Sequence, residues 1–397
     1  MAATTPMDGD GWRFPAAPDV LVEVLARLPP SYRRLLRLVC RTWRDVVDQR
    51  TPEMRSRAAI LVQTERSSYV VDDLSSGRRR ELWTGRCAGD RYEGMCVVGT
   101  CNGLLCLCDT KEPGGAITLA NPATGETLLL PLLPFSGQYY RPFRWGDGRI
   151  ATSRHEAYCF AYLPTTGKYR VVHVPCYPDP AGEFEAVQVF TLGKKSWRNV
   201  PTPGMSCNLK AGILSVDGAM YWLTVGTEKV MSLDLEVGSV TPVKSLPAPA
   251  GPNCQLTVVR GWLGIAISDG SSPLEKIEVW VLEGSRREEQ GWSRRYSIQV
   301  HMLRDEHRWR RQKLTWPQFA QGEYVLTKHS RDWNCFLYGN MVSDAGRLQC
   351  GVLRLSEKKW GMEIGTVGGY GRTFAYVKTT EPLDVYRVSD CRWIHRP

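Results

Sequence analysis

The feature that most constrains the fold is a long series of short apolar runs, each about as long as one β-strand, that begins near Ala58. The clearest runs are Ala59–Val62, Leu104–Leu107, Tyr158–Tyr162, Val187–Phe190, Ala219–Leu223, Ile277–Val281 and Cys335–Tyr338. Turn-forming sequences such as Thr165-Thr166-Gly167 and Asp217-Gly218 separate them. Because apolar runs of this length between turns form strands, we expect an all-β body.

The strands recur in a loose repeat, in which a strand and a turn are followed by a tryptophan. The tryptophans are Trp197, Trp292 and Trp360. Comparable strands lie about 40 to 60 residues apart, which suits propeller blades of four strands. We therefore expect a β-propeller of about six blades between Ala58 and Tyr386, closed by a last strand near Phe374–Val377 or Leu383–Tyr386. A pair of β-sandwiches is the structural alternative.

The first part of the chain follows a helical period instead. Pro18 and Asp19 suit a helix start, and apolar residues then recur on one helical face until Pro29-Pro30 ends the helix. Ser31 can cap a second helix, whose apolar stripe reaches Val47. The two stripes contain Val20, Leu21, Val24, Leu25 and Leu28, then Leu35, Leu36, Leu38, Val39, Cys40, Trp43, Val46 and Val47.

Two short helices cannot bury this apolar surface by themselves. Arginines 33, 37, 41 and 44 occupy the other side of the second helix, as on a solvated face. Either the β body of the same chain or a partner protein must cover part of the apolar stripe. The pattern alone does not choose between them.

Composition narrows the class of protein. The net charge of +10 makes nucleic-acid binding a function to consider, but the sequence contains no recognised nucleic-acid-binding motif. The N-terminal residues lack the apolar core of a secretory signal, and no apolar run approaches the roughly 20 residues that span a bilayer. We expect a soluble protein of the cytoplasm, the nucleus or both. The short basic stretches Arg78–Arg80 and Arg308–Lys313 do not decide between the two compartments.

The 13 cysteines are spread thinly and odd in number, which favours reduced thiols. Cys101, Cys106 and Cys108 lie close together, but no Cys/His pair follows at zinc-finger spacing. Buried strand cysteines are the preferred interpretation, and we expect neither a metal nor a cofactor.

No catalytic motif stands out. The chain has no Gly-x-Ser-x-Gly, His-Glu-x-x-His or phosphate-binding glycine loop, and its six histidines form no obvious triad. The glycine-rich segment Gly365–Gly371 suits a flexible loop better than a phosphate cradle. We expect a non-enzymatic protein, while an active site built from distant residues stays open.

The N-terminal residues resemble an F-box. The similarity is carried by Leu21–Pro30 and then by Arg37-Leu38-Val39-Cys40-Arg41-Thr42-Trp43. Two departures are Phe14-Pro15 in place of a Leu-Pro directly before the first helix, and Tyr32-Arg33 where the family often has Ser-Leu. Two arginines, Arg33 and Arg34, replace apolar residues there, and we expect them to weaken or retune adaptor binding.

The β body is similar to plant F-box-associated domains. Cys101-Asn102-Gly103-Leu104-Leu105, Asn121-Pro122-Ala123-Thr124-Gly125-Glu126, Tyr162–Val172, Val189–Arg198 and Gly218–Leu223 carry this similarity. Together the two resemblances cover most of residues 15–300. They imply a disordered N-terminus over residues 1–14, an F-box over 15–57 and an F-box-associated, propeller-like domain over 58–397.

The resemblance also implies a function. F-box proteins join a target protein to a Skp-type adaptor, which connects to cullin and RING subunits of a ubiquitin ligase. On this basis, both the adaptor contact and the small core of the F-box would come from Pro18, Leu21, Val24, Leu25, Leu28, Pro29, Leu36, Val39, Cys40 and Trp43. The alternatives are a stand-alone propeller that binds a protein or glycan without ligase coupling, a propeller enzyme, and a nucleic-acid binder.

Target recognition is expected on propeller loops, because rigid scaffolds carry function on their connections. One candidate contains Arg304, Arg308, Trp309, Arg310, Arg311 and Trp316. Arginine with tryptophan is typical of binding hot spots and would suit an acidic or phosphorylated target. A solvated basic loop with its tryptophans turned inward is the simpler interpretation of the same residues.

Overall fold

The computed structural model describes residues 18–50, 59–63, 67–73, 78–84, 95–109, 115–134, 143–144, 150–151, 157–175, 183–226, 229–246, 254–259, 261–269, 276–284, 290–299 and 372–388. It also describes the backbone of 304–305, 308–309, 318–320, 324–331, 334–342 and 348–349. The chain divides into two compact units, Met1–Pro52 and Glu53–Pro397. The domain boundary expected after residue 57 falls in 51–58, outside the described residues.

The first unit contains three helices, α1 (Pro18–Arg27), α2 (Pro30–Leu36) and α3 (Arg41–Arg50). The prediction of two helices was wrong, because the second one breaks between Leu36 and Arg41. The backbone tightens there through hydrogen bonds from Leu38 N to Leu35 O and from Val39 N to Leu36 O. Arg44 Nε then donates to the carbonyl of Arg37 at 3.3 Å, which satisfies an acceptor at the end of α2.

The predicted Ser31 cap was also wrong. Ser31 lies inside helix α2, which begins at Pro30 with Pro29 as the capping residue, and no side chain caps it. Proline is favoured at the first helical position because the amide that it lacks would have no partner there.

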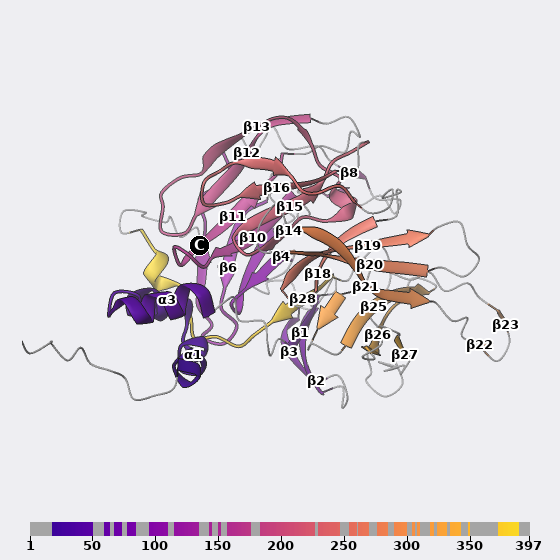
Figure 1. The fold of residues 1–397 in the computed structure, drawn as a ribbon, viewed down its shortest axis with the longest axis horizontal. Helices are drawn as coiled ribbons and strands as arrows, with labels where there is room; N and C mark the ends of the chain where they lie inside the picture. The colour runs from indigo at the N-terminus through magenta and orange to yellow at the C-terminus, as the bar shows by residue number, and fades with distance from the viewer. Residues whose placement is uncertain are drawn as a thin grey trace, which may run out of the picture. The chain divides into compact units, whose positions relative to one another are not determined.

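The second unit is built from four-stranded antiparallel sheets, and the described residues form six of them (Figure 1). Two further pairs, β8 (Phe143–Arg144) with β9 (Ile150–Ala151) and β22 (Arg304–Asp305) with β23 (Arg308–Trp309), stand apart from these sheets. All seven strand-length runs expected from the sequence lie in strands, which confirms the all-β body.

The six sheets follow one another along the chain. In strand order they are β28 (Arg372–Tyr376), β1 (Ala59–Gln63), β2 (Ser67–Asp73), β3 (Arg78–Thr84); β4 (Met95–Cys101), β5 (Leu104–Asp109), β6 (Ile117–Ala120), β7 (Thr127–Leu129); β10 (Tyr158–Leu163), β11 (Lys168–His173), β12 (Glu183–Thr191), β13 (Arg198–Ser206); β14 (Leu214–Val216), β15 (Ala219–Leu223), β16 (Val230–Asp234), β17 (Val240–Pro242); β18 (Cys254–Val259), β19 (Trp262–Asp269), β20 (Lys276–Glu283), β21 (Gly291–Gln299); and β24 (Gln318–Ala320), β25 (Tyr324–Arg331), β26 (Asn334–Val342), β27 (Leu348–Gln349).

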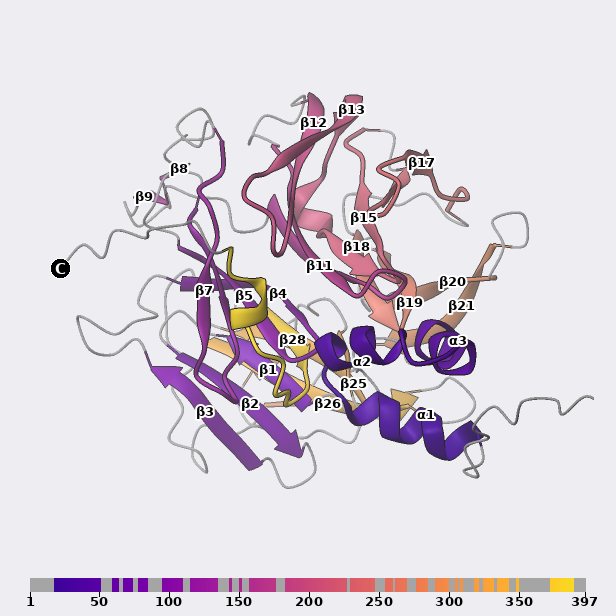
Figure 2. The same ribbon diagram turned by 90° about the vertical axis from the view of Figure 1, so that its left-hand side faces the viewer.

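The first strands of the sheets form a closed ring. In the order β28, β4, β10, β14, β18 and β24, each contacts the next, and β24 contacts β28 again. Buried clusters lie between neighbouring sheets, as where Phe160 and Tyr169 pack with Leu104 and Leu119. The second unit is therefore a six-bladed β-propeller, viewed from two directions in Figures 1 and 2.

The ring closes where the two ends of this unit meet. Strand β28 pairs antiparallel with β1, so that Phe374 lies opposite Leu61 and Ala375 opposite Ile60. The Thr100 hydroxyl of the next sheet also donates to Ala375 O at 2.5 Å. Of the two closing strands expected, the one near Phe374 is confirmed. The other, near Leu383–Tyr386, is instead a 3-10 helix, η4 (Asp384–Tyr386).

A second 3-10 helix, η3 (Leu209–Ala211), lies between β13 and β14. Among the described residues, no helix is long and apolar enough to cross a bilayer.

Candidate docking face of the helical unit

The helical unit has a small core of its own. Leu21 and Leu25 of α1 are buried against Val46 and Val47 of α3, and Val22, Leu28, Leu36 and Trp43 pack partly buried around them. Leu25 has no exposed surface. The helical period explains this core, since residues three or four apart share one face.

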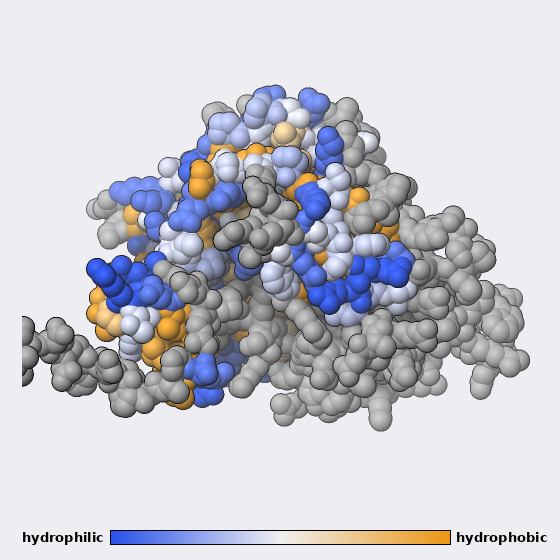
Figure 3. All heavy atoms as spheres, viewed as in Figure 1, coloured by the Kyte–Doolittle hydropathy of each residue, from blue (hydrophilic) through white to orange (hydrophobic). Residues whose placement is uncertain are grey.

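Other apolar side chains of the same unit face outward. Leu38 is 77% exposed, Val39 60% and Val24 52%, and the Cys40 thiol is also exposed. We call this set, together with Val20 and Leu35, the docking face: Val20, Val24, Leu35, Leu38, Val39 and Cys40. Orange spheres gather on the helical unit in Figure 3, at the left of the view. Such a concentration of exposed apolar residues is typical of a protein-binding surface.

The predicted adaptor-binding residues thus fall into groups. Leu21, Leu25 and Pro29 are buried, while Leu28, Leu36 and Trp43 are half-buried. Val24, Val39 and Cys40 belong to the docking face, and the side chain of Pro18 lies outside the described residues. The predicted adaptor-binding set omitted Val20, Leu35 and Leu38, although the sequence places all three in the apolar stripes.

Two arginines brace the connections between the helices. Arg33 Nε donates to the carbonyl of Leu28 at 2.8 Å, across the turn from α1 to α2. Arg44 makes the corresponding bond after α2. Arg33, which departs from the F-box pattern, therefore has a structural task in the turn that carries Pro29 and Pro30.

The predicted target-binding loop is only partly described. Arg304 and Trp309 lie opposite each other in the β22–β23 pair, beside Arg308, and their side chains are outside the described residues. Arg310, Arg311 and Trp316 lie wholly outside them. The target-binding role of these residues therefore stays a prediction.

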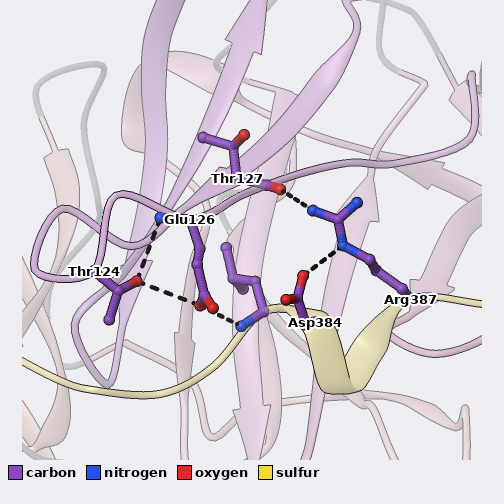
Figure 4. A network of polar contacts seen from close by, with 6 residues as sticks. Thr124, Glu126, Thr127, Asp384 and Arg387 are labelled. Atoms are coloured by element: carbon purple, nitrogen blue, oxygen red, sulfur yellow. Dashed lines mark hydrogen bonds and ion pairs between the residues drawn. The ribbon is translucent and has the colours of Figure 1, made fainter.

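One sequence motif of the propeller, Asn121–Glu126, binds the chain's own C-terminal segment, residues 377–387, which we call the strap. Asn121 Nδ2 donates to the carbonyls of Thr379 and Glu381, at 3.2 and 2.8 Å. The Glu126 carboxylate accepts the amide of Leu383 at 2.9 Å (Figure 4). Arg387 donates to the carbonyl of Thr127 and to Asp384. The Asn121–Glu126 motif thus has a structural role.

The strap also fills part of the core. Leu383 and Tyr386 belong to the buried cluster between the β4–β7 and β10–β13 sheets. There the rings of Tyr386 and Tyr169 pack edge to face, with their centroids 5.8 Å apart. The Tyr386 hydroxyl donates to the buried Glu381 carboxylate at 2.5 Å. Gly103 lies so close to Val377 and Thr379 that no side chain fits at its position.

The buried titratable groups of the propeller belong to its core. Burial lowers the pKa of His173 to about 4, although a hydrogen bond with Gln188 offsets part of the shift. Burial, together with Cys108 and Cys159, raises the pKa of the Cys106 thiol well above its usual range. In the part of the chain that the structure describes, no group of three or more His, Cys, Asp or Glu side chains could hold a metal ion.

Comparisons with known proteins agree with this architecture. Residues 18–53 match the F-box domain, and residues 83–348 match the F-box associated β-propeller domain. An F-box/LRR-repeat protein of Arabidopsis thaliana is 26% identical over 317 residues, which cover 75% of this chain and 70% of that protein. An F-box protein of the same plant is 24% identical over 325 residues, 72% of each chain.

The propeller match spans well over half of the chain, and the F-box match coincides with the three helices of the first unit. The chain is therefore a member of the plant-type F-box proteins that carry an F-box-associated β-propeller.

Proposed function

We propose that this F-box protein is the substrate-recognition subunit of a ubiquitin-protein ligase of the Skp–cullin–F-box type. In this proposal the helical unit binds a Skp-type adaptor, which links it to cullin and RING subunits, while the propeller binds a target protein. The observation that carries the proposal is the docking face, a set of exposed apolar side chains on an F-box.

The proposed contact is helix-in-groove recognition. Apolar side chains at helical spacing, such as Val20 and Val24 of α1, would supply the affinity. Loss of a central anchor of this kind costs about 2 kcal/mol or more. The buried core of Leu21 and Leu25 would hold these anchors in place without touching the adaptor.

The chain would contribute proximity and no covalent chemistry. Binding a target beside the ligase raises the effective concentration of target lysines near the conjugating enzyme. Ubiquitin transfer itself would belong to other subunits.

A pull-down with a Skp-type adaptor tests the proposal. We expect the purified chain to bind, and Val24→Asp and Val39→Asp to weaken binding by at least about tenfold, because each buries a charge in an apolar contact. Val237→Asp is the matched control, since Val237 is 75% exposed but belongs to the propeller. Leu25→Ala, in the core, should instead lower the stability of the helical unit.

Failure of the folded parent chain to bind any adaptor would reject ligase coupling and favour a stand-alone binding propeller. Equal binding by the parent and the two docking-face variants would show that another surface makes the contact.

We also propose that the protein acts in the cytoplasm, the nucleus or both. The 13 cysteines of the sequence are odd in number and spread thinly, which supports a reducing compartment. Imaging of a fluorescent fusion would test this, and a secreted fusion would contradict it.

A further inference from the structure

Arg170 lies in an unusual place for a charged residue, between two propeller blades. On β11 it pairs with Thr191 of β12 and with Ala161 of β10. Partner residues share a face of the sheet, and Ala161 packs in the cluster that joins this blade to Met220 and Trp222 of the next. Arg170 faces the same junction and is only 9% exposed.

The guanidinium of Arg170 is not satisfied there. Its Nε and Nη1 atoms are buried, and neither has a hydrogen-bond partner. A buried charged donor without a partner is costly, and in native proteins it indicates a missing water, ion or ligand. The Thr166 hydroxyl, in the turn before β11, is a second buried group without a partner.

The charged neighbours do not supply the missing partner. Asp234 Oδ1 accepts the amides of Glu236 and Val237, at 2.8 and 2.9 Å. Glu236 Oε2 accepts the Thr165 hydroxyl at 2.7 Å. Both carboxylates belong to the described residues, and neither makes an ion pair or hydrogen bond with Arg170.

Basic side chains outnumber acidic ones around this junction, with Arg170, Arg198 and Lys168 against Asp234 and Glu236. Arg198 of β13 pairs with Val189, which pairs with Val172, so that it shares the face of the sheet that carries Arg170. Burial and Arg198 lower the pKa of the Arg170 guanidinium, and Glu236 and Asp234 offset only part of this shift. Lys168, two residues before Arg170 on β11, shares its face of the sheet. An incoming anion would relieve both the repulsion with Arg198 and the unsatisfied donors.

We propose that Arg170 and Arg198 form a subsite for an oxyanion, a carboxylate or a phosphate, carried by a side chain of the target protein. Nε and Nη1 lie on opposite sides of the guanidinium, and each forms a planar fork with Nη2, so either fork can match two oxygens of such a group. The oxyanion subsite rests on the surroundings of Arg170 alone. Its assignment to a target protein rests on the proposed function.

The test is a titration of the full chain with inorganic phosphate and, separately, with acetate, against chloride at equal ionic strength. Isothermal calorimetry and the thermal midpoint are the two measurements. We expect saturable binding and a rise of the midpoint with concentration, because a ligand that binds only the folded chain stabilises it. Tighter binding of phosphate than of acetate would indicate a phosphorylated side chain, and the reverse an acidic one.

Variants separate the subsite from general anion effects. Arg170→Met should weaken anion binding by about tenfold or more. Arg170→Lys keeps the charge but loses the planar fork, so its affinity should lie between those of the parent and Arg170→Met. Arg294→Met is the matched control, since Arg294 is an exposed strand arginine paired with Glu278. Circular dichroism establishes that each variant is folded.

A linear, non-saturating response, or an equal response in Arg170→Met and the parent, would overturn the subsite. These results do not depend on the adaptor, because the adaptor pull-down is a separate measurement in which Arg170→Met should behave like the parent.

Discussion

At the scale of single residues, two glycines show how closely the strap approaches the propeller. Gly103 and Gly125 both adopt a left-handed backbone, with φ of +83° and +77°. A Cβ atom at Gly103 would come within 2.6 Å of Thr379 Cγ2 and closer still to Val377 O, whereas nothing lies within 4 Å of one at Gly125.

The two glycines therefore make a matched pair of substitutions. Gly125→Ala should lower the free energy of unfolding by about 1 kcal/mol, the cost of the left-handed backbone. Gly103→Ala adds a steric clash with the strap and should lower it by about 3 kcal/mol or more. Urea denaturation measures both, and equal losses would show that the strap does not press on Gly103.

His173 should make stability depend on pH. Its pKa is lowered to about 4 in the folded protein by burial, against an ordinary value near 6.5. Between these values the unfolded chain binds more protons, so stability falls as the pH drops from about 6.5 to about 4. The loss is about 3 kcal/mol at most.

Thermal melts of the parent and of His173→Gln at several pH values measure this effect. The variant should lose less stability than the parent on acidification. Parallel pH profiles for the two proteins would assign the acid sensitivity to other groups.

At the scale of elements, the contacts of the strap are made mainly to its backbone. Asn121 binds two strap carbonyls and Glu126 one strap amide, while Leu383 and Tyr386 are buried. Asn121→Ala removes both donors and also the acceptor for Ala123 N. We expect hydrogen exchange at the Leu383 amide to accelerate about tenfold or more, while exchange in β11 stays unchanged.

The matched control is Arg387→Met, which removes an exposed ion pair of the same strap and should change exchange only slightly. Slow exchange at Leu383 in Asn121→Ala would mean that the buried side chains alone hold the strap.

The same elements show what the sequence could predict. Period-two and strand-length patterns are local, so all seven expected runs were found as strands, and one of the two segments expected to close the ring, near Phe374, does so. The break after Leu36 was missed because apolar residues continue through Leu38 and Val39 at helical spacing. The hydrogen bonds of Asn121 to the strap were not predictable, since its partners Thr379 and Glu381 lie about 260 positions away in the sequence.

The docking face shows a similar limit. The helical period identifies which residues are apolar on one side of a helix, but the depth of burial depends on how three helices pack. Leu25 and Val24 are neighbours in sequence, yet one is wholly buried and the other half exposed. The separation of core from docking face therefore required the structure.

At the scale of the whole propeller, the chain closes the ring twice, first by β28 on β1 and then by the strap on the β4–β7 blade. Deletion of residues 378–397 removes all of the strap except Val377 and leaves β28, so we expect lower stability but a single cooperative transition. Deletion of 372–397 also removes β28, the strand that contacts both β4 and β24. The ring of first strands is then open, because β4 and β24 each lose the strand that lies between them.

Differential scanning calorimetry distinguishes these outcomes. We expect the shorter chain to melt broadly, with a calorimetric enthalpy above its van't Hoff enthalpy, because open arrays lose cooperativity. A synthetic peptide of residues 372–388 added to it should restore a sharp transition, since β28 and the strap bind through backbone hydrogen bonds as well as buried side chains. Sharp, equal transitions in the two truncated chains would show that the ring does not need its closing strand.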